Sequence, residues 1–217
     1  MKDLDDFKRE YVDIYWLHLP TDIEEHLNEI IELYKEGKIK HIGVSNFTLA
    51  ECKRSKDILD KAGIALYGVQ NHFSIICREW EKNGLLQWCK DNDVSFWGWA
   101  VLEEGLLVDP RIPKKSIMKF AFKRKVKKLA GLYKVMIKVA ERHDIKVPQV
   151  AMAFCAAKGV VPMCGCRKPE QVAELAEAAR VVLTIGEIKR LEEASDAANV
   201  KIMGADIFRP FVLKSKK

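Results

Sequence analysis

The sequence predicts an α/β fold in which helices cover a parallel β-sheet. Short apolar runs alternate with amphipathic segments along the whole chain, and the runs are apolar at consecutive positions, as in strands buried on both faces. The chain has 217 residues, of which 48% are hydrophobic and 31% are charged. This size and composition indicate a single globular domain, residues 1–217, and exclude a disordered or collagen-like protein.

Two strand–helix pairs are predicted in the first part of the chain. Residues 12–19 form an apolar and aromatic run that ends at Pro20, and residues 39–44 form a second apolar run. A helix follows each run, because apolar residues recur there at helical spacing and a T-x-x-E capping box opens the segment. The boxes are Thr21 with Glu24 and Thr48 with Glu51, and the glycines expected just past the helix ends are Gly37 and Gly63.

The same alternation continues through the rest of the chain. Three more apolar runs are predicted to be strands, at residues 65–70, 94–99 and 160–164. Helices are predicted at residues 80–91, in a lysine-rich region that ends near residue 143, and at residues 148–158, 169–179 and 184–198. The last helix begins with a third capping box, Thr184 with Glu187, while residues 102–113 are expected to form a loop and residues 199–217 a C-terminal tail.

Of the two main arrangements of a parallel α/β sheet, the sequence favours a barrel. Open doubly wound sheets usually carry a glycine-rich phosphate loop after the first strand, and neither G-x-G-x-x-G nor G-x-x-x-x-G-K-[ST] occurs. A complete (β/α)8 barrel has eight strands and about 250 residues, whereas about five strands are predicted here. The expected fold is therefore an incomplete (β/α)8 TIM-barrel type that comprises about the last five βα units.

Composition also limits the cellular compartment and the kinds of partner that are expected. No apolar run approaches the roughly 20 residues of a membrane helix, and acids occupy the N-terminus where a signal peptide would be basic, so a cytoplasmic protein is predicted. The six cysteines show no C-x-x-C spacing and no histidine at a metal-ligand offset, so reduced thiols and no metal site are predicted. The basic stretch at residues 111–134 is interpreted as a solvated helix face in preference to a phosphate or nucleic-acid surface.

Distinctive residues follow the predicted strands at their carboxyl ends, where parallel α/β folds build their sites. In strand order they are His18; Ser45 and Asn46; Gln70; Trp99; and Gly165, Arg167 and Lys168. Each residue alone fits a structural role, such as a helix cap or a buried hydrogen bond. Because polar groups recur at equivalent ends of successive strands, a ligand site at one edge of the sheet is the better interpretation.

The residue types indicate the chemistry of that ligand. One hydroxyl and two side-chain amides, from Ser45, Asn46 and Gln70, suit a neutral carboxamide such as nicotinamide, and Trp99 offers a flat apolar face for stacking. After the fifth strand, Gly165 allows close backbone approach and a basic pair, Arg167 and Lys168, precedes a helix N-terminus. Positive charge at a helix N-terminus favours a phosphate.

Several blocks of sequence resemble the aldo-keto reductase family. They are V-D-I-Y-W-L-H at 12–18, E-G-K-I-K-H-I-G-V-S-N-F at 36–47, V-Q-N-H-F-S at 69–74, V-L-E-E-G-L-L at 101–107, and P-Q-V-A-M-A-F at 148–154 with G-V-V-P-M-C-G-C-R-K-P-E-Q-V at 159–172. The second and last blocks are specific in combination. The resemblance implies a (β/α)8 barrel that transfers hydride between NADPH and an aldehyde or ketone, without metal or flavin.

The resemblance also implies roles for individual residues. His18 is similar to the active-site histidine that hydrogen-bonds the substrate carbonyl. Ser45, Asn46 and Gln70 resemble the carboxamide ligands, and Trp99 stands where a tyrosine usually stacks on the nicotinamide. Three residues match positions that hold the adenosine end of NADP(H) and its 2′-phosphate, with Arg167 as a neighbour: Lys168, Gln171 and Glu174.

The family's proton-donating tyrosine and its lysine and aspartate partners lie on early barrel strands, before any segment that aligns with this chain. Tyr15 is not expected to replace that tyrosine, because residues 15 and 18 of a strand point to opposite faces. Two functions are therefore expected: an NADP-dependent oxidoreductase, or alternatively a catalytically weak or inactive NADP(H)-binding fragment. An incomplete barrel also leaves open strand edges, through which self-association is expected.

Overall fold

The structure, a computed structural model, describes residues 8–108 and 119–202, without the side chains of residues 119–123. The described chain divides into two compact units. The first unit comprises residues 8–71 and 80–97, and the second comprises residues 72–79, 98–108 and 119–202. Residues 109–113 of the predicted loop, the basic residues before position 119 and residues 203–217 of the predicted tail lie outside the described residues.

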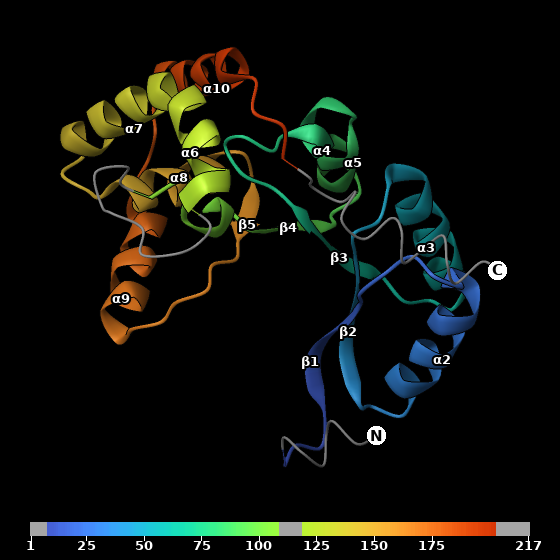
Figure 1. Cartoon of the computed structure of the whole chain (residues 1–217). Coiled ribbons are helices and arrows are strands. Elements are labelled where there is room, and N and C mark those ends of the chain that lie inside the picture. Colours follow the sequence, from blue (N-terminus) through green and yellow to red (C-terminus); the bar gives the residue numbers. More distant parts are fainter. Residues whose placement is uncertain (1–7, 109–118, 203–217) are drawn as a thin grey trace. The chain divides into compact units, whose positions relative to one another are not determined.

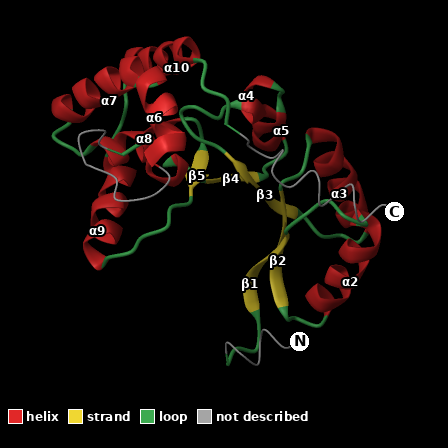
Figure 2. Ribbon diagram, in the orientation of Figure 1, coloured by secondary structure: helices red, strands yellow, loops and turns green. Residues whose placement is uncertain are grey.

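Five strands pair in chain order in one sheet (Figure 2). They are β1 (Val12–Leu17), β2 (Ile39–Ser45), β3 (Leu66–His72), β4 (Ser95–Trp99) and β5 (Val160–Pro162). The β1–β2 and β2–β3 pairs are parallel, and their register places Trp16 beside Gly43 and Ser45 beside Gln70. Parallel pairing of consecutive strands requires a crossover between them, which is the arrangement of successive βα units. The five predicted strands are thus confirmed.

In the first unit, helices cover one face of the sheet. The helices are α2 (Ile23–Lys35), α3 (Leu49–Lys61), most of α4 (Glu79–Lys82) and α5 (Leu85–Asp91), and Figure 1 shows α2 and α3 along the same side of β2. Ile42 and Val44 alternate with Gly43 along β2 and are fully buried, as is Leu27 of α2. The helix-facing side of β2 is therefore aliphatic, which leaves its other side to the polar residues.

On the opposite face, the Trp16 indole lies across two glycines. A Cβ atom at Gly43 would be 2.4 Å from the Trp16 ring, and one at Gly68 would be 2.7 Å from Ser95 Oγ. Trp16 also meets Trp97 edge to face, with ring centroids 5.7 Å apart. Glycine is required at positions 43 and 68 because any side chain there would displace this aromatic pair.

The three predicted capping boxes have different outcomes. Thr48 with Glu51 and Thr184 with Glu187 both form, each with reciprocal hydrogen bonds. The prediction for Thr21 with Glu24 was wrong, because α2 begins one residue later. Its N-cap is Asp22, in the left-handed region with φ 41°, and no side chain caps the helix. The chain turns at Asp22 before the first helical residue, so the Thr21 hydroxyl is not placed to accept from the first turn.

The second unit packs its helices around β5. They are α6 (Lys119–Lys128), α7 (Ala130–Arg142), α8 (Val147–Ala157), α9 (Pro169–Glu177) and α10 (Ile185–Ala198), with short 3-10 turns η1 (Glu103–Gly105) and η2 (Ala178–Arg180). The core of this unit includes fully buried residues from α7, α8 and α10: Leu132, Met136, Val150, Phe154 and Leu191. Within the described residues, no helix is both long and apolar enough to cross a bilayer.

Two segments predicted to be helical each form two helices. Residues 80–91 form α4 and α5, because Gly84 between them has φ +88°, which ends one helix and starts the next. The lysine-rich region forms α6 and α7, which meet at Leu129. Leu129 is fully buried, so the turn between these helices is fixed by packing rather than by a turn residue.

Candidate active site

In the first unit, Ser45, Asn46 and Gln70 are joined at the carboxyl ends of β2 and β3. The Ser45 hydroxyl donates to the Gln70 backbone carbonyl at 2.9 Å, and Asn46 Nδ2 donates to Ser45 Oγ at 3.1 Å. The Asn46 backbone N–H also donates to the Gln70 carbonyl, at 3.1 Å. Ser45 is fully buried, and Asn46 is nearly so. These neutral groups therefore hold one another in fixed positions.

Asn46 turns the chain from β2 toward α3. Its φ of 63° lies in the left-handed region, which asparagine tolerates better than most residues. The next residue is clamped by Asn71, which accepts from the Phe47 N–H at 3.2 Å and donates to the Phe47 carbonyl at 2.8 Å. Asn71 was not among the predicted site residues, and only its position next to Gln70 in the sequence could have indicated this role.

His18 lies at the same edge of the first unit. Asn46 Nδ2 donates to the His18 backbone carbonyl at 3.1 Å, which ties the end of β1 to the end of β2. The His18 residue itself is exposed. The structure thus brings together His18, Ser45, Asn46 and Gln70, as the sequence predicts for successive strand ends.

Gln70 offers the group best placed for a ligand. Its side chain is half-buried, and its Oε1 lies 3.5 Å from Ser45 Oγ. Its Nε2 group has no hydrogen-bond partner among the described residues, so it can donate to an incoming acceptor.

In the second unit, Trp99 stacks on His72. The ring centroids are 4.4 Å apart and the planes are inclined by 21°. The Trp99 carbonyl accepts from the Phe73 N–H at 3.2 Å, which joins the ends of β3 and β4. His72 therefore covers one face of the half-buried Trp99 indole.

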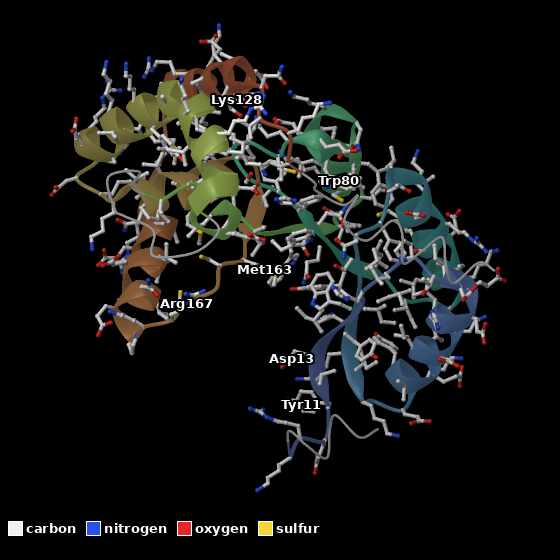
Figure 3. The ribbon with its side chains drawn as sticks, viewed as in Figure 1. Tyr11, Asp13, Trp80, Lys128, Met163 and Arg167 are labelled. Atoms are coloured by element: carbon white, nitrogen blue, oxygen red, sulfur yellow. The ribbon has the colours of Figure 1, made fainter. Side chains whose placement is uncertain are left out.

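The segment between β5 and α9 carries the predicted phosphate residues (Figure 3 labels Arg167). Arg167 and Lys168 are exposed, and their backbone N–H groups both donate to Gln171 Oε1, at 2.8 and 3.2 Å. Gln171 therefore fixes the backbone at the start of α9. A Cβ atom at Gly165 would meet nothing within 4 Å, so the space beside this residue is open.

Glu174, the last predicted site residue, lies one turn further along α9. Its carboxylate pairs with the Lys146 ammonium, and its backbone carbonyl accepts from Gln149 Nε2 at 2.6 Å. Gln149 is buried, so this bond fastens α9 to α8 within the second unit.

Comparison with known proteins identifies the family. The model of the aldo/keto reductase family matches residues 2–196 of the chain. The chain belongs to the aldo/keto reductase family.

Named relatives and solved structures of this family resemble the chain along most of its length. An aldo-keto reductase of Gibberella moniliformis is 27% identical over 198 residues, which cover 85% of this chain and 59% of that protein. The NADPH-dependent alpha-keto amide reductase of Saccharomyces cerevisiae is 24% identical and covers 85% of this chain and 55% of its own length. The thermostable aldo-keto reductase Tm1743, solved with the inhibitor epalrestat, matches with a TM-score of 0.70 at 25% identity.

These matches also define the fold. The glycerol dehydrogenase AKR11B4 of Gluconobacter oxydans matches with a TM-score of 0.75 at 24% identity, over 92% of this chain and 63% of that structure. Tm1743 is matched over 88% of this chain and 62% of that structure. The fold is therefore α/β of the TIM-barrel type, and the aldo/keto reductase chain spans about half to three fifths of the length of the curated relatives that it matches.

Proposed function

We propose that this aldo/keto reductase chain binds NADP(H) and takes part in hydride transfer between NADPH and a small aldehyde or ketone. The observation that carries the proposal is the arrangement at the ends of β2 and β3. Ser45 and Asn46 are fixed by mutual hydrogen bonds, and the Nε2 group of neighbouring Gln70 has no partner within residues 8–108 and 119–202. A fixed hydroxyl and two amides match the donor and acceptor pattern of a nicotinamide carboxamide.

The proposed phosphate end of the cofactor site rests on the segment before α9. Exposed cations at Arg167 and Lys168, open space beside Gly165 and a helix N-terminus are favourable to an anion. Gln171 holds the backbone of that segment, and Glu174 is assigned to the adenosine end.

Each residue has a distinct role in the proposed reaction. Bound NADPH supplies the hydride. Ser45, Asn46 and Gln70 orient the carboxamide, and Trp99 is assigned to stack on the nicotinamide ring. His18 donates a hydrogen bond to the substrate carbonyl oxygen and so polarises the carbon that accepts hydride.

A second candidate function is NADP(H) binding with little or no turnover. It is favoured by the resemblance itself, because the family's tyrosine, lysine and aspartate have no counterpart among the aligned blocks of this chain. A positioned general acid contributes about 10²–10⁴ in rate. Without such a group, His18 binds and polarises the carbonyl but does not deliver the proton efficiently.

Titration with NADPH, followed by tryptophan fluorescence, tests the binding part of the proposal. We expect saturable quenching in the wild-type chain and a dissociation constant about 2–10-fold higher in Gln70→Ala, because one neutral hydrogen bond is lost. Gln87→Ala is the matched control, since Gln87 is an exposed glutamine that bonds Asp91 on α5. Unchanged fluorescence at millimolar NADPH would contradict the proposal that the chain binds NADP(H).

NADPH oxidation in the presence of simple aldehydes separates the two candidate functions. Turnover that His18→Ala abolishes while NADPH binding is retained supports the oxidoreductase. Cofactor binding without turnover supports the binding protein.

Other expectations from the sequence extend the proposal. We propose that residues 1–217 act as a single aldo-keto reductase-like domain in the cytoplasm. We further propose that its partners are small carbonyl compounds rather than nucleic acid, and that open strand edges promote self-association. Sedimentation at several protein concentrations tests the last point, and a monomer at all concentrations would contradict it.

A further inference from the structure

Three ionisable side chains in the second unit are not used by the proposed function. They are His72 at the end of β3, Cys77 in the segment that follows, and Glu103 of η1. One ring nitrogen, the thiol sulfur and one carboxylate oxygen all lie within 4.8 Å of one another. These three residues are called the His-Cys-Glu cluster below.

The His-Cys-Glu cluster is buried, and its hydrogen-bonding groups are not all paired among the described residues. Its residues are only 4%, 8% and 5% exposed, respectively. His72 Nε2 is 2.8 Å from Glu103 Oε1, the oxygen that also accepts from the Ser74 hydroxyl. The other ring nitrogen, Nδ1, is buried and has no hydrogen-bond partner in the part of the chain that the structure describes.

The charge of the cluster is also unbalanced. Among the described residues, the Glu103 carboxylate contacts the His72 ring but no lysine or arginine. Burying a carboxylate without a permanent cation, and leaving a buried ring nitrogen unpartnered, both cost free energy. A bound dication would lower the first cost because it neutralises the carboxylate. It would lower the second cost where Nδ1 is the nitrogen that ligates it.

The ligand types and spacing suit zinc. Imidazole nitrogen, thiolate sulfur and carboxylate oxygen are the ligands that Zn²⁺ takes in proteins, at about 2.0–2.3 Å. Two ligands of a tetrahedral ion at these bond lengths are about 3.3–3.8 Å apart. The present separations, all within 4.8 Å, therefore require side-chain shifts of about 1 Å or less.

Binding of a metal ion is coupled to ionisation of the Cys77 thiol. Burial, together with the charges of Glu103 and Glu79, raises the pKa of the Cys77 thiol to about 12. A metal ion that binds the sulfur lowers this pKa, and the thiol proton is released to solvent. Metal affinity is therefore expected to rise with pH.

We propose that His72, Cys77 and Glu103 bind one Zn²⁺ ion, with a water molecule as the fourth ligand. The ion ties the segment after β3 to the η1 turn. It also fixes the His72 ring on which Trp99 stacks. This site does not depend on the proposed function, because none of its ligands is assigned to the cofactor or the substrate.

Cobalt substitution in the full chain tests the proposal. The background is Cys164→Ser/Cys166→Ser, because these are the two cysteines that are not buried. After chelation and desalting, Co²⁺ titration is expected to give a thiolate-to-cobalt charge-transfer band and tetrahedral visible bands that saturate at one equivalent. Zn²⁺ then displaces the cobalt, and Mg²⁺ does not.

Variants locate the site. Adding Cys77→Ser to this background is expected to abolish the charge-transfer band. Adding Glu103→Gln is expected to weaken cobalt binding more than about tenfold, because residues that only hydrogen-bond to a ligand already contribute about 10–100-fold to metal affinity. Cys89→Ser is the matched control, because burial also raises the pKa of the Cys89 thiol to about 12. Absence of the band in the folded background protein would overturn the proposal whatever the variants do. A band retained in folded Cys77→Ser would overturn it as well.

Discussion

The two units differ in the charge of the side chains that the site and its surroundings use. In the first unit, the polar edge is made of neutral groups that hydrogen-bond one another: Ser45, Asn46, Gln70 and Asn71 with the backbone of Phe47. In the second unit, charged groups are prominent, both exposed at Arg167 and Lys168 and buried at Glu187. The first unit should therefore respond mainly to changes of shape, and the second to pH and salt.

Glu187 shows what the charged arrangement contributes. It is fully buried and caps α10 through Thr184, while its two oxygens meet Arg142 at 2.9 Å and His143 at 3.1 Å. Burial opposes its ionisation, but the hydrogen bonds from Thr184, His143 and Arg142 outweigh burial and lower its pKa from 4.5 to about 2. The same T-x-x-E motif at Thr48 and Glu51 has no such cations among its hydrogen-bond partners.

Replacing Glu187 is expected to give the largest effect on stability. A pKa lowered by that amount stabilises the fold by about 3 kcal/mol at neutral pH, and Glu187→Gln removes most of it. Because the folded-state pKa is depressed, this contribution is complete above pH 4.5 and is lost as the pH falls toward 2. Urea unfolding across this pH range measures it.

Glu51→Gln is the matched control in the first unit. It removes one capping interaction from α3 and is expected to cost about 1 kcal/mol or less. If Glu187→Gln and Glu51→Gln lowered the free energy of unfolding equally, the contrast between the units would be contradicted.

Asn46 tests the neutral network. Asn46→Ala is expected to cost about 2 kcal/mol, because it removes buried hydrogen bonds and puts alanine in the left-handed region. Asn46→Gly is expected to cost less, since glycine adopts a φ of 63° without strain. Both losses, measured by urea unfolding, are expected to stay constant between about pH 5 and 8, because Ser45, Gln70 and Asn71, the described partners of this network, are neutral. A loss that varies with pH would contradict this interpretation.

Arg167 tests the exposed charges. Arg167→Ala is expected to raise the dissociation constant for NADPH about 10–100-fold, and the increase is expected to be larger at low salt than at high salt. The dissociation constant for NADH is expected to rise much less. Its effect on unfolding is expected to stay within about 0.5 kcal/mol, because the residue is exposed. Lys189→Ala, at an exposed lysine of α10, is the control, and fluorescence titration at two ionic strengths is the measurement.

The smallest effect concerns thiol reactivity. Cys164 and Cys166 flank Gly165 and are accessible, whereas the other four cysteines are buried. A thiol reagent is expected to modify these two in the folded chain, with little effect on stability, and the rest only on unfolding. NADPH is expected to slow this reaction, and mass spectrometry after peptide digestion identifies the modified residues. Fast modification of Cys89 in the folded chain would contradict the assigned burial.

Much of the fold and part of the site could be predicted from sequence. Strand–helix alternation, the five strands and the glycines past α2 and α3 are properties of short contiguous segments, and each was found as expected. The grouping of His18, Ser45, Asn46 and Gln70 in the first unit follows from one rule, that carboxyl ends of parallel strands meet at one edge. The role of Asn71 could not be predicted, because an asparagine at a strand end fits several structural roles.

The sequence by itself therefore determined the class of fold, the family and the chemistry of the strand-end residues, since periodicity and motifs are local. Tertiary structure decided which capping boxes form and which carboxylate meets a cation, as Glu187 meets Arg142 from 45 residues away. It also decided that His72 and Cys77 meet Glu103, although their spacing shows no metal motif. Such contacts depend on strand order and helix packing, which bring distant segments together, and no local pattern records them.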